Sequence, residues 1–197
     1  MITRKGQATR ERILAAAAAL MYERGVAGTS TEDVQTAAGV SASQLYHYFG
    51  DKRALVRAVI EHQTEAILGF QETFLARLDD LDALRAWADV VVTLQRSRGF
   101  RGGCPLGSLA SELADGDDAA REDLAISYRR WREAIRDGLA DMQQRGELVA
   151  AADVDRLATV LLTTLQGGLL LTKTMRDGEP LETSLTTVID YIASFAA

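Results

Sequence analysis

Apolar positions recur at helical spacing along almost the whole chain. In residues 9–23 they form one stripe that ends before Gly25, made of Ile13, Leu14, Ala17, Ala18, Leu20 and Met21. The same period continues in the segments 52–77, 83–96, 105–114, 118–145, 154–175 and 180–196. Ala, Leu, Arg, Glu and Gln are abundant and lose little rotamer freedom in a helix. The pattern predicts an all-α fold of about nine helices.

Two short helices are predicted between the first helix and the fourth. Ser30 is followed three residues later by Asp33, and Ser41 is followed three residues later by Gln44. Each pair has the spacing of an N-terminal capping box. The short segment at Gly39 between the two helices has the length of the turn in a helix-turn-helix. A plain helical hairpin without a nucleic-acid role has the same local pattern.

The net charge of −6 argues against a protein that coats nucleic acid by bulk electrostatics. Its distribution along the chain is uneven, because residues 1–53 hold seven Lys or Arg and five acidic residues. Residues 54–197 hold fifteen basic and twenty-three acidic residues. Any contact with phosphate is therefore expected in the first quarter of the chain.

Cysteine and histidine are too few for several classes of site. One cysteine, Cys104, excludes an intrachain disulfide framework, and one Cys with two His makes an all-protein zinc site unexpected. We expect no metal and no cofactor. The N-terminus has no apolar run, and the stretch from Ala158 to Thr172 is shorter than a membrane span. These observations predict a cytoplasmic protein without a membrane partner.

The run from Thr36 to Leu55, TAAGVSASQLYHYFGDKRAL, closely resembles the motif of the TetR (tetracycline repressor) family of transcriptional regulators. That motif is AGVS, a short variable segment, L-Y-x-[HY]-F, and a Lys early in the fourth helix. The resemblance covers about residues 8–56. It implies a DNA-binding domain at residues 1–51 and a ligand-binding and dimerisation domain at 52–197. It also implies a homodimeric repressor that binds a palindromic double-stranded operator and is released by a small-molecule inducer.

Helix geometry and the resemblance together suggest the DNA contacts. The first residues of a recognition helix face base edges in the major groove, and Gln44 has an amide suited to adenine. The residues expected to read bases are Ala42, Ser43, Gln44 and His47. By resemblance to the family, the residues expected to contact phosphates are Thr31, Ser41, Tyr46, Tyr48 and Lys52. Ser41 also serves as a helix cap, which is compatible with a phosphate contact.

The last two helices carry enough apolar surface to predict a dimer seam. The side chains expected there are Leu161, Leu165, Leu169, Leu185, Val188, Ile189 and Ile192. The adjacent Gly167 and Gly168 would let a partner helix approach closely. Burial of these side chains within one chain is the alternative. If the last two helices do form the dimer seam, two-fold symmetry would space the two recognition helices by one DNA turn, about 34 Å.

Ligand-binding residues are less clearly marked in the sequence. Aromatic and polar residues that could line a mostly apolar pocket are Trp87, Phe100, Tyr128, Trp131 and Gln166, and they could equally be core. Cys104, just before the helix predicted from Pro105, offers an electrophile-sensing or redox-sensing alternative. A purely structural cysteine fits as well.

The sequence also bears on two other classes of function, an enzyme and a DNA-binding protein that is not a repressor. The chain shows no carboxylate pair, Ser/His/Asp order or glycine-rich phosphate loop after a strand, so no enzyme is expected. An activator, or a DNA binder that is not a repressor, stays open as an alternative.

Overall fold

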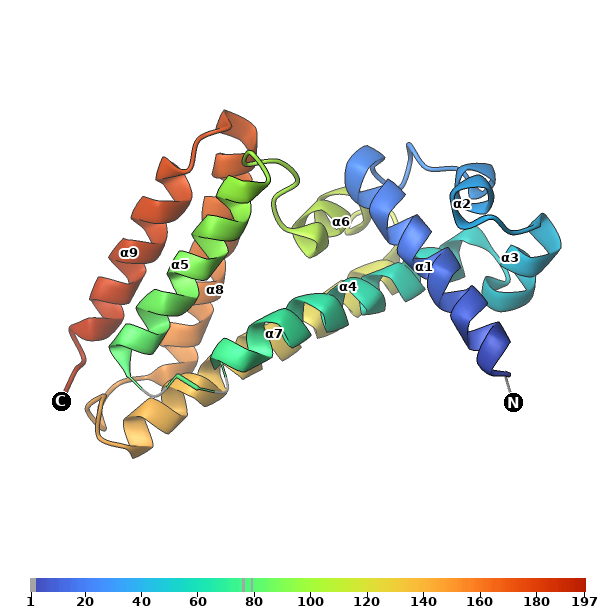
Figure 1. Cartoon of the computed structure of the whole chain (residues 1–197). Coiled ribbons are helices and arrows are strands. Elements are labelled where there is room, and N and C mark those ends of the chain that lie inside the picture. The colour runs from blue at the N-terminus through green and yellow to red at the C-terminus, as the bar shows by residue number, and fades with distance from the viewer. Residues whose placement is uncertain (1–2, 76, 79) are drawn as a thin grey trace. The chain divides into compact units, whose positions relative to one another are not determined.

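A computed structural model describes residues 3–75, 77–78 and 80–197, and these residues form nine α-helices (Figure 1). Within them, the only extended pairing is an isolated antiparallel bridge between Leu148 and Ala196. The helices are α1 (Arg4–Arg24), α2 (Thr31–Ala38), α3 (Ala42–Phe49), α4 (Lys52–Leu75), α5 (Leu81–Ser97), α6 (Pro105–Leu113), α7 (Asp118–Gln144), α8 (Val154–Met175) and α9 (Glu179–Ala193). The all-α prediction is confirmed.

Local capping explains where the observed helices differ from the predicted ones. α1 begins five residues earlier than expected, because the Thr3 side chain accepts a hydrogen bond from the Gly6 N–H at 3.2 Å and caps the helix. α5 begins two residues earlier, because Asp80 caps the Ala83 N–H at 2.8 Å. The predicted fourth helix extends to residue 77. The observed α4 ends at Leu75, and residues 76 and 79 lie outside the described residues.

The chain divides into two compact units. One contains residues 3–66 with 105–127, and the other contains 67–104 with 128–197. The boundaries fall inside α4 and inside α7. α6 and the first turns of α7 therefore belong with the N-terminal helices. The predicted division at residue 51 concerns function and stays a prediction.

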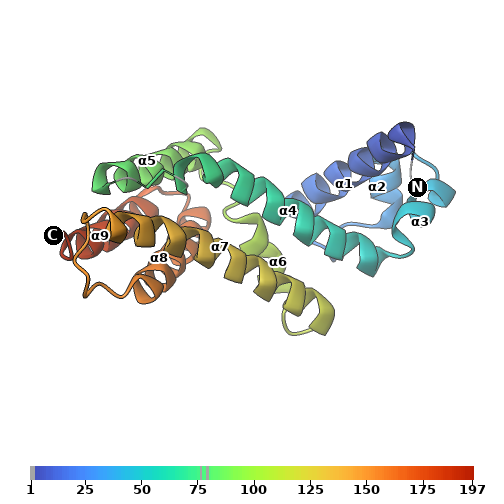
Figure 2. The same cartoon turned by 90° about the horizontal axis from the view of Figure 1, so that it is seen from below.

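The first unit is built around the buried faces of α1, α2, α3 and the start of α4 (Figure 2). Ile13 of α1, Val34 of α2 and Leu45 of α3 are each 0% exposed. Within α2 the buried residues are Val34 and Ala38, and within α3 they are Leu45 and Phe49. Each pair is four residues apart, so each short helix buries one apolar face in a shared core. The opposite faces of α2 and α3 stay available to solvent.

In the second unit, α8 packs along α9, and α5 also packs on α9 (Figure 1). α8 alone among the described helices is long and apolar enough to cross a membrane, judged by length and composition. Its side chains at Leu157, Leu161 and Leu165 are buried within this unit, as expected for a core helix. Gly168 lies where α8 and α9 approach most closely, since a Cβ there would lie 2.6 Å from Ser184 Oγ.

Candidate nucleic-acid interface and ligand-binding core

The α2 and α3 helices are each fixed at their N-termini by a complete capping box. Ser30 Oγ accepts from the Asp33 N–H at 3.1 Å, and Ser41 Oγ accepts from the Gln44 N–H at 3.2 Å. Both boxes were predicted and both are confirmed. Gly39 ends α2 in the left-handed conformation, with a φ of 62°, which a Cβ would disfavour. Two short helices are thereby set in a defined helix-turn-helix.

Asp33 shows the electrostatic side of this capping. Its carboxylate accepts hydrogen bonds from the Ser30 side chain at 2.7 Å and the Ser30 backbone N–H at 2.9 Å. These bonds stabilise the charged form and lower the pKa of Asp33 below its ordinary value. The α2 N-terminus is therefore held in part by an ionised group.

The four residues predicted to read bases all lie on the exposed surface of α3. Ala42, Ser43, Gln44 and His47 are exposed, whereas Leu45 and Phe49 point into the core. One face of the helix therefore anchors it, and the start of the opposite face is free to enter a groove. Base contacts by these four residues stay a prediction.

Gln44 has a second role that competes with base reading. Its Oε1 accepts from the Ser41 backbone N–H at 3.0 Å as part of the capping box. A bidentate contact with adenine uses the same oxygen as acceptor and the amide nitrogen as donor. The amide N–H groups can donate to a base without loss of the cap, whereas a bidentate contact would share or break the bond to Ser41.

The predicted phosphate-contacting residues are held by contacts within the first unit. Thr31 at the start of α2 and Tyr46 of α3 lie together, with their hydroxyl oxygens 3.4 Å apart. Tyr46 is 45% exposed, so its ring end can reach a ligand. Tyr48 is half-buried and stacks edge-on against His47. Ser41 is the cap of α3, as its alternative role required.

Lys52 does more than present a charge. Its ammonium donates to the Val26 carbonyl at 2.9 Å, which ties the start of α4 to the segment between α1 and α2. An ammonium has three donors, so Lys52 can hold this carbonyl and still contact a phosphate. The sequence motif predicted the phosphate contact, and the structure adds the tie to Val26.

Two basic residues of α1 support the same small domain and were not singled out from the sequence. Arg12 Nε donates to the Ala38 carbonyl at 2.8 Å, at the C-terminus of α2. The Arg10 guanidinium lies over the Phe49 ring, 5.2 Å from its centroid. Both contacts join residues far apart in sequence, so no local pattern marks them.

Glu112 of α6 holds the segment that precedes α2. Its carboxylate accepts from the Val26 N–H at 2.7 Å and from the Ala27 N–H at 2.5 Å. Together with Lys52, it satisfies both backbone polar groups of Val26. This contact joins residues at least 85 positions apart, so no local sequence pattern marks it.

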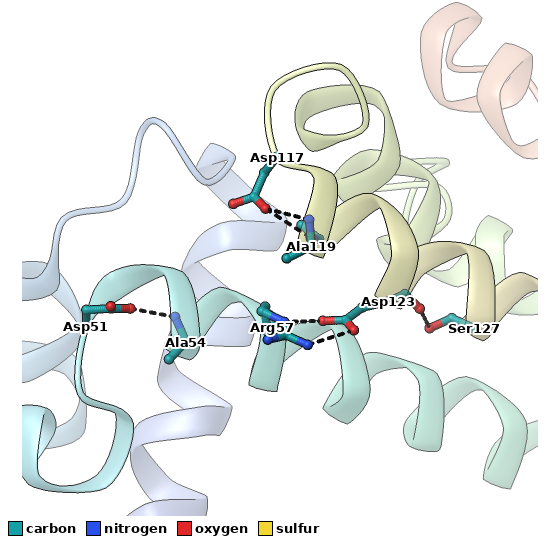
Figure 3. Close-up of polar contacts among 8 residues, drawn as sticks. Asp51, Ala54, Arg57, Asp117, Ala119, Asp123 and Ser127 are labelled. Atoms are coloured by element: carbon teal, nitrogen blue, oxygen red, sulfur yellow. Dashed lines mark hydrogen bonds and ion pairs between the residues drawn. The ribbon is translucent and has the colours of Figure 1, made fainter.

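Two polar contacts join α4 to the first turns of α7 in the same unit, and Figure 3 shows the one between Arg57 and Asp123. Arg57 makes a bidentate ion pair with Asp123, with nitrogen–oxygen distances of 2.5 and 3.0 Å. Thr64 and Ser127, both buried, share a hydrogen bond of 2.8 Å between their hydroxyl oxygens. These two contacts hold the first turns of α7 against α4.

All six residues predicted for ligand binding lie in the second unit, but only some are brought together. Tyr128 of α7 donates from its hydroxyl to Gln166 Oε1 of α8 at 3.4 Å. Burial, and then the nearby Cys104, raise the pKa of Tyr128 above its ordinary value. Tyr128, Gln166 and Cys104 therefore form one neighbourhood.

The other three predicted ligand residues have separate surroundings. Trp131 donates from Nε1 to Gln71 Oε1 at 2.9 Å, and both side chains are buried. Phe100 lies by the turn before α9, where a Cβ on Gly178 would come within 2.9 Å of its ring. Trp87 of α5 is 1% exposed.

Cys104 is the residue immediately before α6, as predicted, and its side chain is buried with 8% exposure. A reactive thiol has to be reached by its oxidant or electrophile. The burial favours the structural alternative for this cysteine.

Three buried donor atoms of the second unit have no acceptor among the described residues. They are Trp87 Nε1, Arg132 Nε and Gln166 Nε2. Trp87 and Gln166 were among the predicted ligand residues, and Arg132 was not. The sequence around Arg132 contains several arginines and does not single it out. Only the burial of its Nε atom in the fold distinguishes it.

The side chains predicted for the dimer seam prove to be core residues of the chain itself. All seven, Leu161, Leu165, Leu169, Leu185, Val188, Ile189 and Ile192, are between 0% and 5% exposed. They are covered largely by the packed helices of the second unit, which fits the alternative of burial within one chain. An apolar stripe does not indicate which neighbour covers it, so contact of these residues with a second copy stays a prediction.

The two adjacent glycines of α8 have different surroundings. Gly168 faces α9, whereas Gly167 is exposed, with no atom within 4 Å of its hypothetical Cβ. The exposed apolar side chains of the last two helices are Leu170, Leu171, Met175 and Tyr191.

Comparison with known proteins agrees with this architecture. Residues 13–59 match a family model described as bacterial regulatory proteins of the tetR family, and residues 81–188 match a tetracyclin repressor-like C-terminal domain. An uncharacterized HTH-type transcriptional regulator of Mycobacterium tuberculosis is 31% identical, over 89% of this chain and 90% of its own. The HTH-type transcriptional repressor DhaR of a Mycobacterium species is 26% identical, over 88% of this chain and 86% of its own.

A solved TetR transcriptional regulator from Chloroflexus aurantiacus is 33% identical and superimposes with a TM-score of 0.80, over 98% of each chain. A regulator from Cytophaga hutchinsonii has a TM-score of 0.84 over 99% of this chain and 98% of its own, at 20% identity, and shows the shared fold. The family matches together include both the helix-turn-helix and most of the second unit. The chain therefore belongs to the TetR family of ligand-responsive, DNA-binding transcriptional regulators.

Proposed function

We propose that this regulator is a cytoplasmic repressor that binds a palindromic operator as a homodimer and leaves it when a small molecule binds the second unit. The observation that carries the proposal is the exposed N-terminal surface of α3, presented by a helix whose other face is fully buried. A helix held in this way enters the major groove without having to order itself first.

The DNA contacts follow from that surface. Ala42, Ser43 and His47 are free to meet base edges, and Gln44 donates from its amide nitrogen. Phosphates on either side are contacted by Thr31, Ser41, Tyr46, Tyr48 and Lys52, together with the N–H groups at the helix starts.

The homodimer is proposed to use the faces of α8 and α9 that point away from the core. Leu170 and Leu171 are 59% and 52% exposed, and Met175 is 60% exposed. Exposed side chains of this size on one helix favour cover by a second copy. Gly167 on the same helix offers a place for close approach.

Leu170→Glu tests this surface. Sedimentation of the purified variant is expected to show a shift from dimer to monomer, with the helix content retained. Ile126→Glu is the matched control, because Ile126 is an exposed apolar residue of α7 in the other unit, with 43% exposure. A dimer unaffected by Leu170→Glu would place the interface elsewhere.

The DNA-binding proposal is tested by fluorescence anisotropy with DNA from upstream of the protein's own gene and with random duplex of equal length. A repressor is expected to prefer its operator by about a thousandfold or more at physiological salt. Equal affinity for both duplexes at every salt concentration would contradict the proposal. Transcription from the operator in vitro then separates a repressor from an activator.

A further inference from the structure

The second unit buries three hydrogen-bond donors that have no acceptor among the described residues, each on a different helix. Trp87 Nε1 lies on α5, Arg132 Nε on α7 and Gln166 Nε2 on α8. Buried polar atoms in folded proteins almost always have a partner, and each one without a partner is costly. All three atoms are donors, so whatever satisfies them has to supply acceptors.

Two of the three donors are related through a shared neighbour, Tyr128. Tyr128 donates to Gln166 Oε1, which leaves the Gln166 amide nitrogen beside the Tyr128 ring end. Arg132 is four residues after Tyr128 on α7, and residues at that spacing lie on the same face of a helix. Arg132 and Gln166 therefore border the same part of the unit.

The positive charge of Arg132 indicates which kind of acceptor group a ligand would supply. Among the described residues, no carboxylate forms an ion pair with its guanidinium. A partly buried cation without a counter-charge is unfavourable and is stabilised by an anion that comes close. An arginine is also the side chain best shaped for a carboxylate, which it can bind with two parallel hydrogen bonds.

We infer that the ligand of the second unit is an organic anion, with its acidic group on Arg132 and Gln166 and its apolar body among the buried aromatic side chains. The inference rests on the proposed function and names the ligand class for the same unit. Trp87 supplies a further donor for an acceptor on the ligand body. Arg132 thus becomes the residue that distinguishes an acid from its uncharged analogue.

The test uses the full-length protein and a fixed panel of acids: hexanoate, octanoate, benzoate and 3-phenylpropanoate. The corresponding primary alcohols serve as uncharged analogues. Binding is followed by tryptophan fluorescence, since Trp87 and Trp131 are the only tryptophans of the chain. At least one acid is expected to bind about tenfold or more tightly than its alcohol, the difference typical of one charge-assisted hydrogen bond.

Arg132→Met keeps the length of the side chain and removes the charge. It is expected to abolish the preference for the acid and to leave the unfolding temperature of the free protein unchanged or higher, because an unpaired cation has been removed. A lower unfolding temperature would indicate a structural arginine and would contradict the inference. Arg129→Met on the exposed surface of α7 is the control and should keep the preference.

A second variant covers the possibility that Arg132→Met does not fold. Gln166→Glu is expected to weaken the acid by about tenfold or more while the alcohol binds as before. The inference is overturned if no acid on the panel binds, or if acids and alcohols bind alike. Release of operator DNA by an alcohol would overturn the inference and leave the proposed function intact, whereas failure to bind any operator would contradict the proposed function itself.

Discussion

The carboxylate of Glu112 accepts a 2.7 Å hydrogen bond from the backbone N–H of Val26, and so joins α6 to the segment that leads into α2. The second bond, from Ala27, makes the contact bidentate. Because α2 and α3 carry the predicted DNA-binding surface, we expect Glu112 to affect operator binding through the position of α2 and not by contact with DNA.

Glu112→Gln is expected to weaken operator binding and to lower the unfolding free energy by about 1 kcal/mol, because an amide oxygen accepts more weakly than a carboxylate. The loss in affinity should be about fivefold on operator and random duplex alike. Chemical denaturation and anisotropy measure the two effects. Asp115→Asn is the control for the change in charge, since Asp115 is exposed and lies two residues after α6.

Gln44→Ala should cost about 1–3 kcal/mol of operator affinity at one base pair and relax the choice of base there. It also removes half of the capping box, so the domain should become less stable. Gln44→Glu separates the two roles, since it keeps the oxygen that caps Ser41 and loses the amide donor. Binding of the Gln44→Ala and Gln44→Glu proteins to a library of single-base operator variants measures the affinity and the base preference of each. A Gln44→Glu protein with unchanged base preference would remove Gln44 from base reading.

Lys52→Ala is expected to weaken all DNA sequences to the same extent and to reduce the salt dependence of binding by about one unit of slope. The variant should also lose stability, because the Val26 carbonyl loses its donor. Arg53→Ala removes the same charge from the next, exposed residue and is expected to leave stability unchanged. A Lys52→Ala protein with normal affinity in a salt titration would show that Lys52 acts only on the fold.

The capping of α2 predicts a pH dependence of stability. The pKa of Asp33 is lower in the folded protein than its ordinary value of 3.8, so the unfolded state binds more protons in acid. Its stabilising effect is complete above the ordinary value and is lost as pH falls through the folded one. Between about pH 6 and about pH 3, the stability difference between the wild type and Asp33→Ala should shrink. Urea unfolding of both proteins at a series of pH values measures this difference.

Local sequence patterns predicted the parts of the structure that depend on near neighbours. The Ser30–Asp33 and Ser41–Gln44 boxes, and the ends of α2 and α3, follow from residues within one turn of each other. The Glu112 contact with Val26 and the burial of the Arg132 Nε atom depend on which helices meet in space. No spacing along the chain encodes those meetings, so both were missed.

The dimer seam shows the same limit. Leu165 and Ile189 lie on clear apolar stripes, and such a stripe predicts burial without naming the partner. In the structure, the chain's own helices cover both residues, and the large apolar side chains left exposed on α8 and α9 are Leu170, Leu171, Met175 and Tyr191.

The adjacent glycines of α8 are therefore expected to differ in the side chains that they tolerate. Gly168→Ala would bring a methyl group 2.6 Å from Ser184 Oγ and 3.2 Å from the Leu181 Cα of α9, so a lower unfolding temperature is expected in a thermal melt. Gly167→Ala meets nothing within the chain and should fold normally. Among relatives that form different dimers, residue 168 should stay small because it packs inside the chain. Residue 167 lies on the proposed dimer surface and should vary, so a change at 167 alone would indicate a change in subunit association.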